Sequence, residues 1–216
     1  MLRTLALVMI MLAPLAADAG KKVIVGNFSE GQLSGWEEKS FEGHTTYKLV
    51  DGPYSQALRA VTQGEASGLY KAIEVDLAKT PWLNWSWKIT NIFTDNDEKT
   101  RAGDDYPARV YVVVSGGLFF WRTRAINYVW ASHEPQGSQW DNAYTDKAKM
   151  VAVQSGEAKA GQWVQEKRNV RKDLENVFGE AIGQIDAVAV MVDGDNTGQS
   201  AESFFGDIYF SEKPGN

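Results

Sequence analysis

The sequence predicts an all-β protein, a jelly-roll-like antiparallel β-sandwich with one short helix. Three observations support this fold class. Apolar and polar residues alternate with period two along ten short segments, as in half-buried strands. Turn signals rich in Gly, Asp, Asn and Ser separate these segments. Helical spacing of apolar residues occurs in one short segment. Two antiparallel sheets that each bury one face accommodate this pattern.

The predicted strands follow one another along the chain. They cover residues 46–50, 57–61, 69–75, 83–89, 108–114, 125–131, 149–154, 163–170, 187–192 and 203–210. In 83–89, one leucine, one isoleucine and two tryptophan side chains share one face, and polar residues occupy the other. In 108–114, small apolar residues alternate with Arg109 and Tyr111, which we expect to face away from the core.

The one predicted helix covers residues 171–178. Leu174, Val177 and Phe178 have helical spacing there, and Gly179 is placed to end the helix.

The first 19 residues are predicted to be a secretory signal peptide. Arg3 provides a positive start, residues 5–15 an apolar stretch, and a small-x-small site ends at Ala19. Cleavage between Ala19 and Gly20 would leave one β-sandwich domain over 20–216, in the periplasm or secreted.

Composition excludes several classes of function. The 216 residues include 28 acidic and 22 basic side chains, a net charge of −6 that disfavours binding to nucleic acid or anionic lipid. No second apolar run approaches the length of a membrane span. The absence of cysteine excludes disulfides, thiol nucleophiles and Cys-ligated metals. The oligomeric state is left open.

Common catalytic motifs are absent, although two suitably placed carboxylates suffice for a glycosidase. Glu74 and Asp76 resemble the first two acids of the E-x-D-x-x-E strand of laminarinase-like sandwiches, but the third position is Lys79. We therefore favour an ordinary strand end before Pro81.

A polar cluster is predicted at the rim of the sandwich. Asp105 lies just before the strand that carries Arg109, so the two can pair bidentately, either structurally or around a ligand. Asp193 and Asp195 open a segment that resembles the start of a calcium loop, but its twelfth position is Phe204 instead of Glu, so we favour a tight Asx-rich turn over a polar site at the rim. Arg168 offers a second guanidinium. The predicted cluster comprises Asp105, Arg109, Tyr128, Arg168, Asp193 and Asp195, and is lined by Trp130.

Aromatic residues are abundant, with eight Trp, eight Tyr and nine Phe. Most must be core, but Tyr111, Tyr128, Trp130 and Trp140 accompany polar residues and are the candidates for exposure. Flat rings beside amide, Arg and Asp groups suit a sugar, whose C–H face lies on the ring while its hydroxyls bond the polar groups.

Blocks along nearly the whole mature chain carry a family resemblance. In order they are PWLNWSWKI, DDYPARVYVVV, INYVWAS, GQWVQEKRNVRKDLENVFG and AVAVMVDGDNTGQSAESFFGDIYF. The chain resembles the family known only as domain of unknown function 3047. This resemblance implies an exported bacterial protein, with no known activity, substrate or site residues.

The segments NFSEGQLSGW and FFGDIYF resemble, more loosely, the terminal strands of carbohydrate-binding jelly-roll modules. That resemblance implies a structural calcium between an acid after the first-strand Phe and an Asp in the last strand. Here Ser29 follows Phe28 and the acid is displaced to Glu30, whereas Asp207 fits. The alternative is that Asp207 only accepts backbone hydrogen bonds. No other cofactor is expected.

The leading hypothesis is a noncatalytic periplasmic β-sandwich that binds an oligosaccharide or related polyol. One alternative is a glycan hydrolase or lyase on the same scaffold, which would use Asp105, Asp193 and Asp195 with Tyr128 or an Arg. Another is a structural or interaction protein of the cell envelope.

Overall fold

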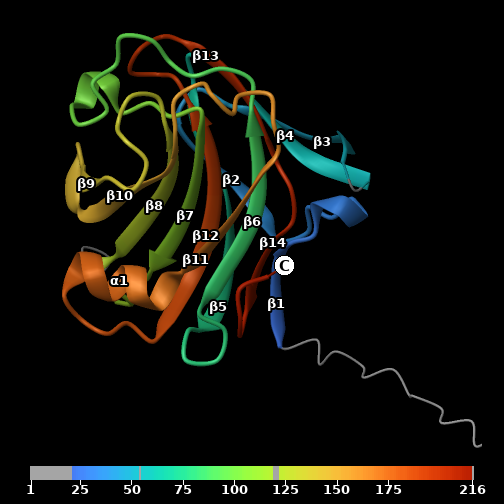
Figure 1. The fold of residues 1–216 in the computed structure, drawn as a ribbon, viewed down its shortest axis with the longest axis vertical. Helices are drawn as coiled ribbons and strands as arrows, with labels where there is room; N and C mark the ends of the chain where they lie inside the picture. Colours follow the sequence, from blue (N-terminus) through green and yellow to red (C-terminus); the bar gives the residue numbers. More distant parts are fainter. Residues whose placement is uncertain (1–20, 54, 119–121, 216) are drawn as a thin grey trace, which may run out of the picture.

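The protein is a sandwich of two β-sheets, as the sequence predicts (Figure 1). A computed structural model describes residues 21–53, 55–118 and 122–215. The predicted signal peptide, 1–19, lies outside the described residues. No helix in the described part of the chain is long and apolar enough to cross a membrane.

The described chain forms fourteen strands, one α-helix and two 3₁₀ turns. The strands are β1 Lys22–Gly26, β2 Trp36–Glu42, β3 Thr46–Gly52, β4 Ser55–Gln63, β5 Ala66–Asp76, β6 Trp82–Ile89, β7 Ala108–Val114, β8 Arg124–Ala131, β9 Gln139–Asn142, β10 Thr145–Ser155, β11 Val164–Asn169, β12 Gln184–Asp193, β13 Ser200–Phe205 and β14 Ile208–Ser211. The helix is α1 Val170–Phe178, and the turns are η1 Phe28–Glu30 and η2 Arg101–Gly103. All ten predicted segments contain strand, and β1, β2 and β9 were not predicted.

The first sheet has the order β1-β14-β6-β13-β4-β3, and β11 pairs with β6. The single strand predicted over 203–210 is wrong, because β13 and β14 are separated at Gly206 and Asp207. The Gly206 amide still bonds Ser86 O at 2.9 Å, so the two pieces continue along the same partner, β6. An added Cβ at Gly206 would lie 2.2 Å from Ser86 Oγ, which explains why glycine occupies this break.

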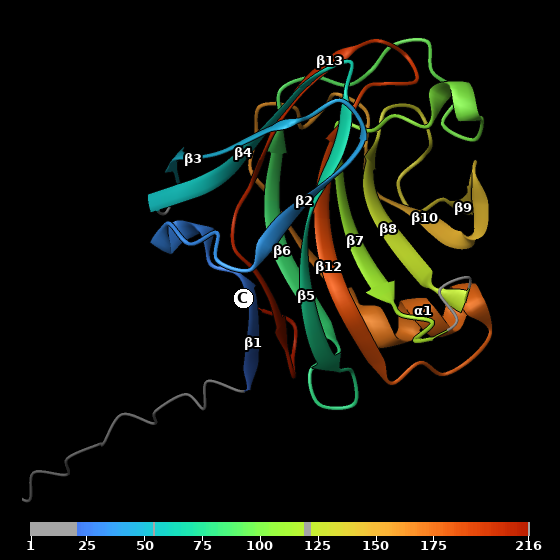
Figure 2. The same ribbon diagram turned by 180° about the vertical axis from the view of Figure 1, so that it is seen from behind.

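The second sheet has the order β2-β5-β12-β7-β8-β10-β9. Figure 2 shows β5, β12, β7 and β8 side by side in this sheet. Strands β8 and β10 are its one parallel pair among the described residues, and the other pairs are antiparallel.

The core lies between the two sheets. Trp85 and Trp87 of β6 are 3% and 0% exposed, which confirms the predicted apolar face of this strand. Their rings meet Tyr128 and Trp130 of the second sheet at centroid distances of 5.5 and 5.8 Å. These ring contacts join the two layers.

The helix α1 confirms the predicted helix and begins one residue earlier. The Asn169 side chain accepts a hydrogen bond from the Lys172 amide at 3.1 Å, which caps the first turn. Gly179 ends the helix at φ 72°, a conformation that favours glycine. Val170 and Leu174 are buried against the sandwich.

Candidate functional site

A groove runs along the outer face of the second sheet. It consists of two adjoining hollows of about 450 and 460 Å³ that share Phe41, Tyr111 and Met191. The polar hollow also contains Asp104, Arg109, Asn127, Asn142, Tyr144, Asp193, Asp195 and Asn196. The apolar hollow also contains Gly68, Tyr70, Val113, Ala187 and Ala189, together with the charged residues Glu38 and Lys39. Arg109 and Tyr111 therefore face away from the core, as the strand pattern predicts.

Arg109 and Asp193 form a buried pair at the base of the polar hollow, and the sheet register places them there. Arg109 lies opposite Met191 on β12, so Asp193 is its diagonal neighbour on the same face. The Arg109 Nε donates to Asp193 Oδ1 at 2.8 Å, and Nη2 donates to Asp193 Oδ2. The two residues are 3% and 2% exposed.

The remaining donors of Arg109 are also used within the protein. Its Nη1 donates to the Tyr111 hydroxyl at 3.1 Å, and Nη2 donates to the Asp104 carbonyl. The guanidinium lies 4.3 Å from the centre of the Tyr106 ring. Asn142 Nδ2 donates to both carboxylate oxygens of Asp104, at 3.1 and 3.0 Å. Each nitrogen of Arg109 therefore donates within the protein, and Nη1 also lies 3.7 Å from Asp104 Oδ2, so the guanidinium organises the base of the hollow.

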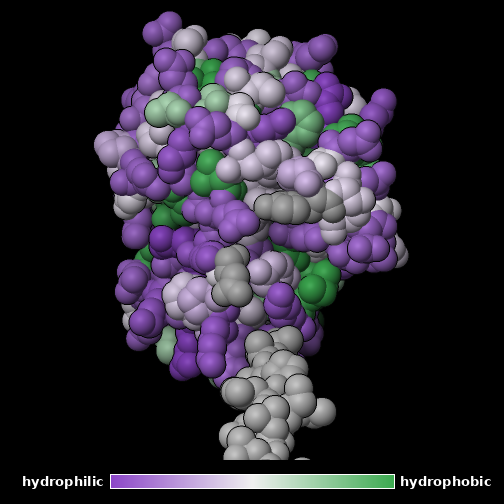
Figure 3. Space-filling model, turned by 45° about the vertical axis from the view of Figure 1, so that its right-hand side comes forward, coloured by the Kyte–Doolittle hydropathy of each residue, from purple (hydrophilic) through white to green (hydrophobic). Residues whose placement is uncertain are grey.

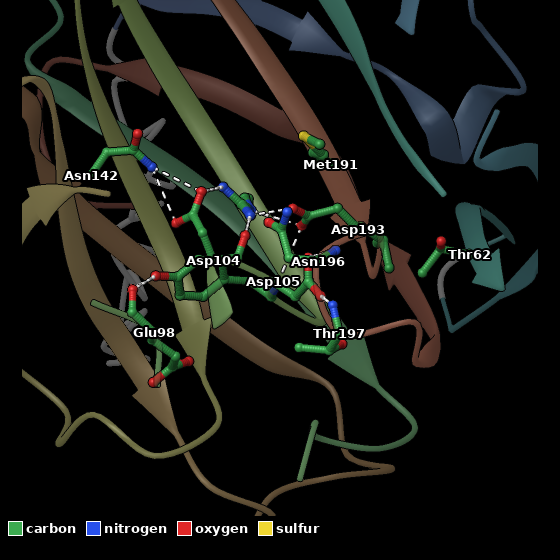
Figure 4. A network of polar contacts seen from close by, with 12 residues as sticks. Thr62, Glu98, Asp104, Asp105, Asn142, Met191, Asp193, Asn196 and Thr197 are labelled. Carbon is green, nitrogen blue, oxygen red and sulfur yellow. Dashed lines mark hydrogen bonds and ion pairs between the residues drawn. The ribbon is translucent and has the colours of Figure 1, made fainter. Parts of the chain in front are cut away.

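Asp105 does not pair with Arg109, so that prediction is wrong. Its carboxylate instead accepts the backbone amides of Asn196 at 3.2 Å and Thr197 at 2.6 Å. Figure 4 shows the Asp105 carboxylate directed toward Thr197. The register of β7 with β12 determines this pairing. It places Arg109 beside Asp193, so the Asp105 carboxylate is left to bind the loop after β12.

The segment that begins at Asp193 is a turn between β12 and β13, and it also forms one wall of the polar hollow. Carboxylate oxygens of Asp105, Asp193 and Asp195 lie within 4.8 Å of one another. Burial raises the pKa of Asp193 to about 8; Arg109 opposes this shift, while Asp105 and Asp104 add to it. Burial and Asp105 also raise the pKa of Asp195. The turn thus places more carboxyl groups beside Arg109 than one guanidinium can neutralise.

Tyr128 and Trp130 do not join this cluster. Both are 0% exposed, so their predicted exposure is wrong. They lie opposite Val110 and Ala108 on β7, and directly opposed residues of a sheet share a face, here the core face. Their neighbour Asn127 lies on the groove face instead, opposite Tyr111.

Arg168 also lies apart from Arg109. It belongs to β11 of the first sheet and binds Asp173 of α1 through Nε at 2.9 Å and Nη2 at 2.7 Å. The Tyr128 hydroxyl donates to the same carboxylate at 2.8 Å. The structure thus divides the predicted cluster in two, with Asp105, Arg109, Asp193 and Asp195 at the groove and the other residues in the sandwich interior or beside α1.

The predicted calcium ligands are Glu30 and Asp207. No hydrogen bond of the described residues joins these two side chains. Both Asp207 carboxylate oxygens accept hydrogen bonds from Ser29, at 2.8 Å from its amide and 2.6 Å from its hydroxyl. Glu30 is exposed. Asp207 therefore accepts a backbone hydrogen bond, as the alternative to calcium binding predicts, and a second one from the Ser29 hydroxyl.

Sequence reasoning missed several residues of the groove. Phe41 and Tyr144 are 62% and 51% exposed, and neither was singled out. Phe41 follows four polar residues, 37–40, in β2, a signal that could have been used. Asp104 was not distinguished from its neighbour Asp105, and Asn142 gives no sequence signal.

The fold and groove place the molecule in the class of two-sheet, jelly-roll-like β-sandwiches. The chain belongs to the family described as protein of unknown function (DUF3047), whose model matches residues 34–209. No curated protein matches it in sequence.

Several solved structures are similar to this one. Cellulose induced protein, Cip1, is 11% identical with a TM-score of 0.50, over 87% of this chain and 96% of that one. The CBM22-1 xylan-binding domain of Xyn10C from Paenibacillus barcinonensis is 13% identical with a TM-score of 0.41, over 92% and 99%. The glycoside hydrolase domain of Endo-D from Streptococcus pneumoniae R6 is 10% identical with a TM-score of 0.42, over 82% and 22%. The chain spans 22%, 21% and 62% of the length of three matched structures.

Proposed function

We propose that this protein binds an oligosaccharide or related polyol in the groove of the second sheet, without catalysing a reaction. The observation that carries the proposal is the continuity of the two hollows, with the exposed rings of Phe41 and Tyr144 beside buried polar groups. Aromatic faces accept the C–H face of a sugar, and fixed polar groups orient its hydroxyls. The sheet is seven strands wide, and six steps of about 4.8 Å give roughly 29 Å, which favours an oligosaccharide over a single sugar.

The hydrogen bonds that the acids already accept favour binding over the hydrolase or lyase alternative. Asp105 and Asp193 accept hydrogen bonds on both carboxylate oxygens from groups of the protein itself. Tyr128, also named in that alternative, is 0% exposed on the opposite side of the sheet. Asp105, Asp193 and Tyr128 are thus engaged in holding the structure. Asp195 remains in the hollow, but one carboxylate alone does not make the pair that glycoside hydrolysis uses.

The alternative of an envelope interaction protein calls for a broad apolar surface. The face seen in Figure 3 is dominated by hydrophilic side chains, with apolar ones scattered among them.

We also propose export to the periplasm. The intact mass of the exported protein should then correspond to a chain that begins at Gly20.

A panel of soluble oligosaccharides tests the binding proposal, followed by calorimetry with each hit. Phe41→Ala and Tyr144→Ala are each expected to weaken binding about tenfold or more. Both should leave the free energy of unfolding within about 0.5 kcal/mol of the parent value, because the rings are exposed. Ile24→Ala is the matched control, since Ile24 is 50% exposed on β1 of the other sheet. Unchanged affinity in both groove variants would refute the proposed site.

A further inference from the structure

The polar hollow has more acidic than basic side chains. Glu42, Asp104, Asp193 and Asp195 line it, and Arg109 is the one cationic side chain among its described lining residues. With Asp193 protonated near pH 6, ionisation of the other three carboxylates would still leave two negative charges beyond the charge of Arg109. Each nitrogen of Arg109 already donates within the protein, so an anionic ligand in the polar hollow would meet the acids and no other lining cation, because Lys39 lines the adjoining hollow.

A second observation is independent of the acids. Asn127 is 1% exposed and lines the same hollow, yet its Oδ1 has no hydrogen-bond partner. A buried acceptor without a donor is costly, because it has lost its hydrogen bond to water. A ligand that brings N–H or O–H donors into the hollow would remove this cost.

The walls are compatible with a cationic sugar. The Tyr144 ring stands at the rim with its hydroxyl accepting from Asn196 Nδ2 at 3.0 Å. The Arg101 guanidinium lies 5.1 Å from the centre of this ring, and the residue is still 51% exposed, so ring surface remains for the C–H groups of a sugar. Donors directed at carboxylates form stronger hydrogen bonds when they are charged.

We propose that the polar hollow binds the protonated amine of an amino sugar, so that this hollow selects de-N-acetylated sugar units over neutral ones and disfavours uronic acids. This inference rests on the proposed function, since it names the class of glycan that the groove binds. The ammonium group would donate to Asn127 Oδ1 and to the carboxylates, and would balance part of the surplus negative charge.

Calorimetry with four hexasaccharides near pH 6 tests the proposal. The probes are the β-1,4-glucosamine hexamer, its fully N-acetylated form, cellohexaose and a galacturonic acid hexamer. We expect the glucosamine hexamer to bind about tenfold more tightly than cellohexaose, and the galacturonic acid hexamer to bind most weakly. Asp195→Asn should reduce the ratio of the affinity for the glucosamine hexamer to the affinity for cellohexaose. Asp146→Asn is the control, because Asp146 is an exposed acid outside the hollow and should leave this ratio unchanged.

The outcomes separate the two proposals. Binding of cellohexaose with no preference for the glucosamine hexamer would overturn the amine proposal and leave glycan binding intact. Failure of every oligosaccharide to bind would overturn glycan binding itself. Loss of binding in EDTA and its recovery with Ca²⁺ would show that a metal ion occupies the acids, and would also overturn the amine proposal.

Discussion

Replacing Arg109 by Ala tests whether the base of the polar hollow is structural. The side chain is 3% exposed, and its removal leaves the Asp193 carboxylate with the Tyr106 amide, at 3.3 Å, as its remaining hydrogen-bond donor. Removal of one partner of a buried ion pair costs about 3–5 kcal/mol because the other charge is left without compensation. We expect a loss of this size in the free energy of unfolding, measured by urea titration near pH 9.

The loss should depend on pH in a definite direction. The pKa of Asp193 is raised from 3.8 to about 8 in the folded protein, so its contribution to stability is fully present below about pH 4 and is lost as the pH rises through about 8. Without Arg109, which opposes this shift, the folded state takes up the proton more readily. The penalty of Arg109→Ala should therefore be smaller near pH 5 than near pH 9.

Arg124→Ala is the matched control for this experiment. Arg124 of β8 pairs with Glu180, and the two side chains are 27% and 56% exposed. An exposed pair of this kind contributes about 0–1 kcal/mol, so the control should stay near the parent protein. A penalty below about 1 kcal/mol for Arg109→Ala near pH 9, or one that does not shrink near pH 5, would refute the reasoning.

Three further substitutions test the rest of the sandwich, each by denaturant titration. Trp87→Ala should cost about 3–5 kcal/mol because the ring is 0% exposed between the sheets, and a loss below about 1 kcal/mol would contradict its burial. Tyr128→Phe keeps the ring but removes the hydrogen bond to Asp173, so a loss of about 1.5–3 kcal/mol is expected; an unchanged midpoint would show that this bond is dispensable. Gly194→Ala should cost about 1–3 kcal/mol, since the new Cβ would lie 2.1 Å from a backbone oxygen. Gly183→Ala is its control, with no atom within 4 Å, and equal effects of the two would contradict the steric explanation.

Local patterns were sufficient to predict the fold class and many elements. The alternation in 83–89 placed two tryptophans in the core, and Gly179 ended the helix where expected. These outcomes follow from the chain itself, because side-chain alternation and glycine conformation depend on neighbours in the sequence. The same alternation predicted that the Arg109 side chain lies on the outer face of the sheet.

The groove depended on contacts between segments distant in the sequence. Arg109 and Asp193 are 84 positions apart and meet because β7 pairs with β12 in one register. Tyr128 entered the core because it lies opposite Val110, which its polar neighbours in the sequence did not indicate. A shift of register by one residue would exchange the two faces of each strand. The sequence by itself therefore determined the sandwich and its alternating faces, whereas strand pairing alone decided which acids, amides and rings share the groove.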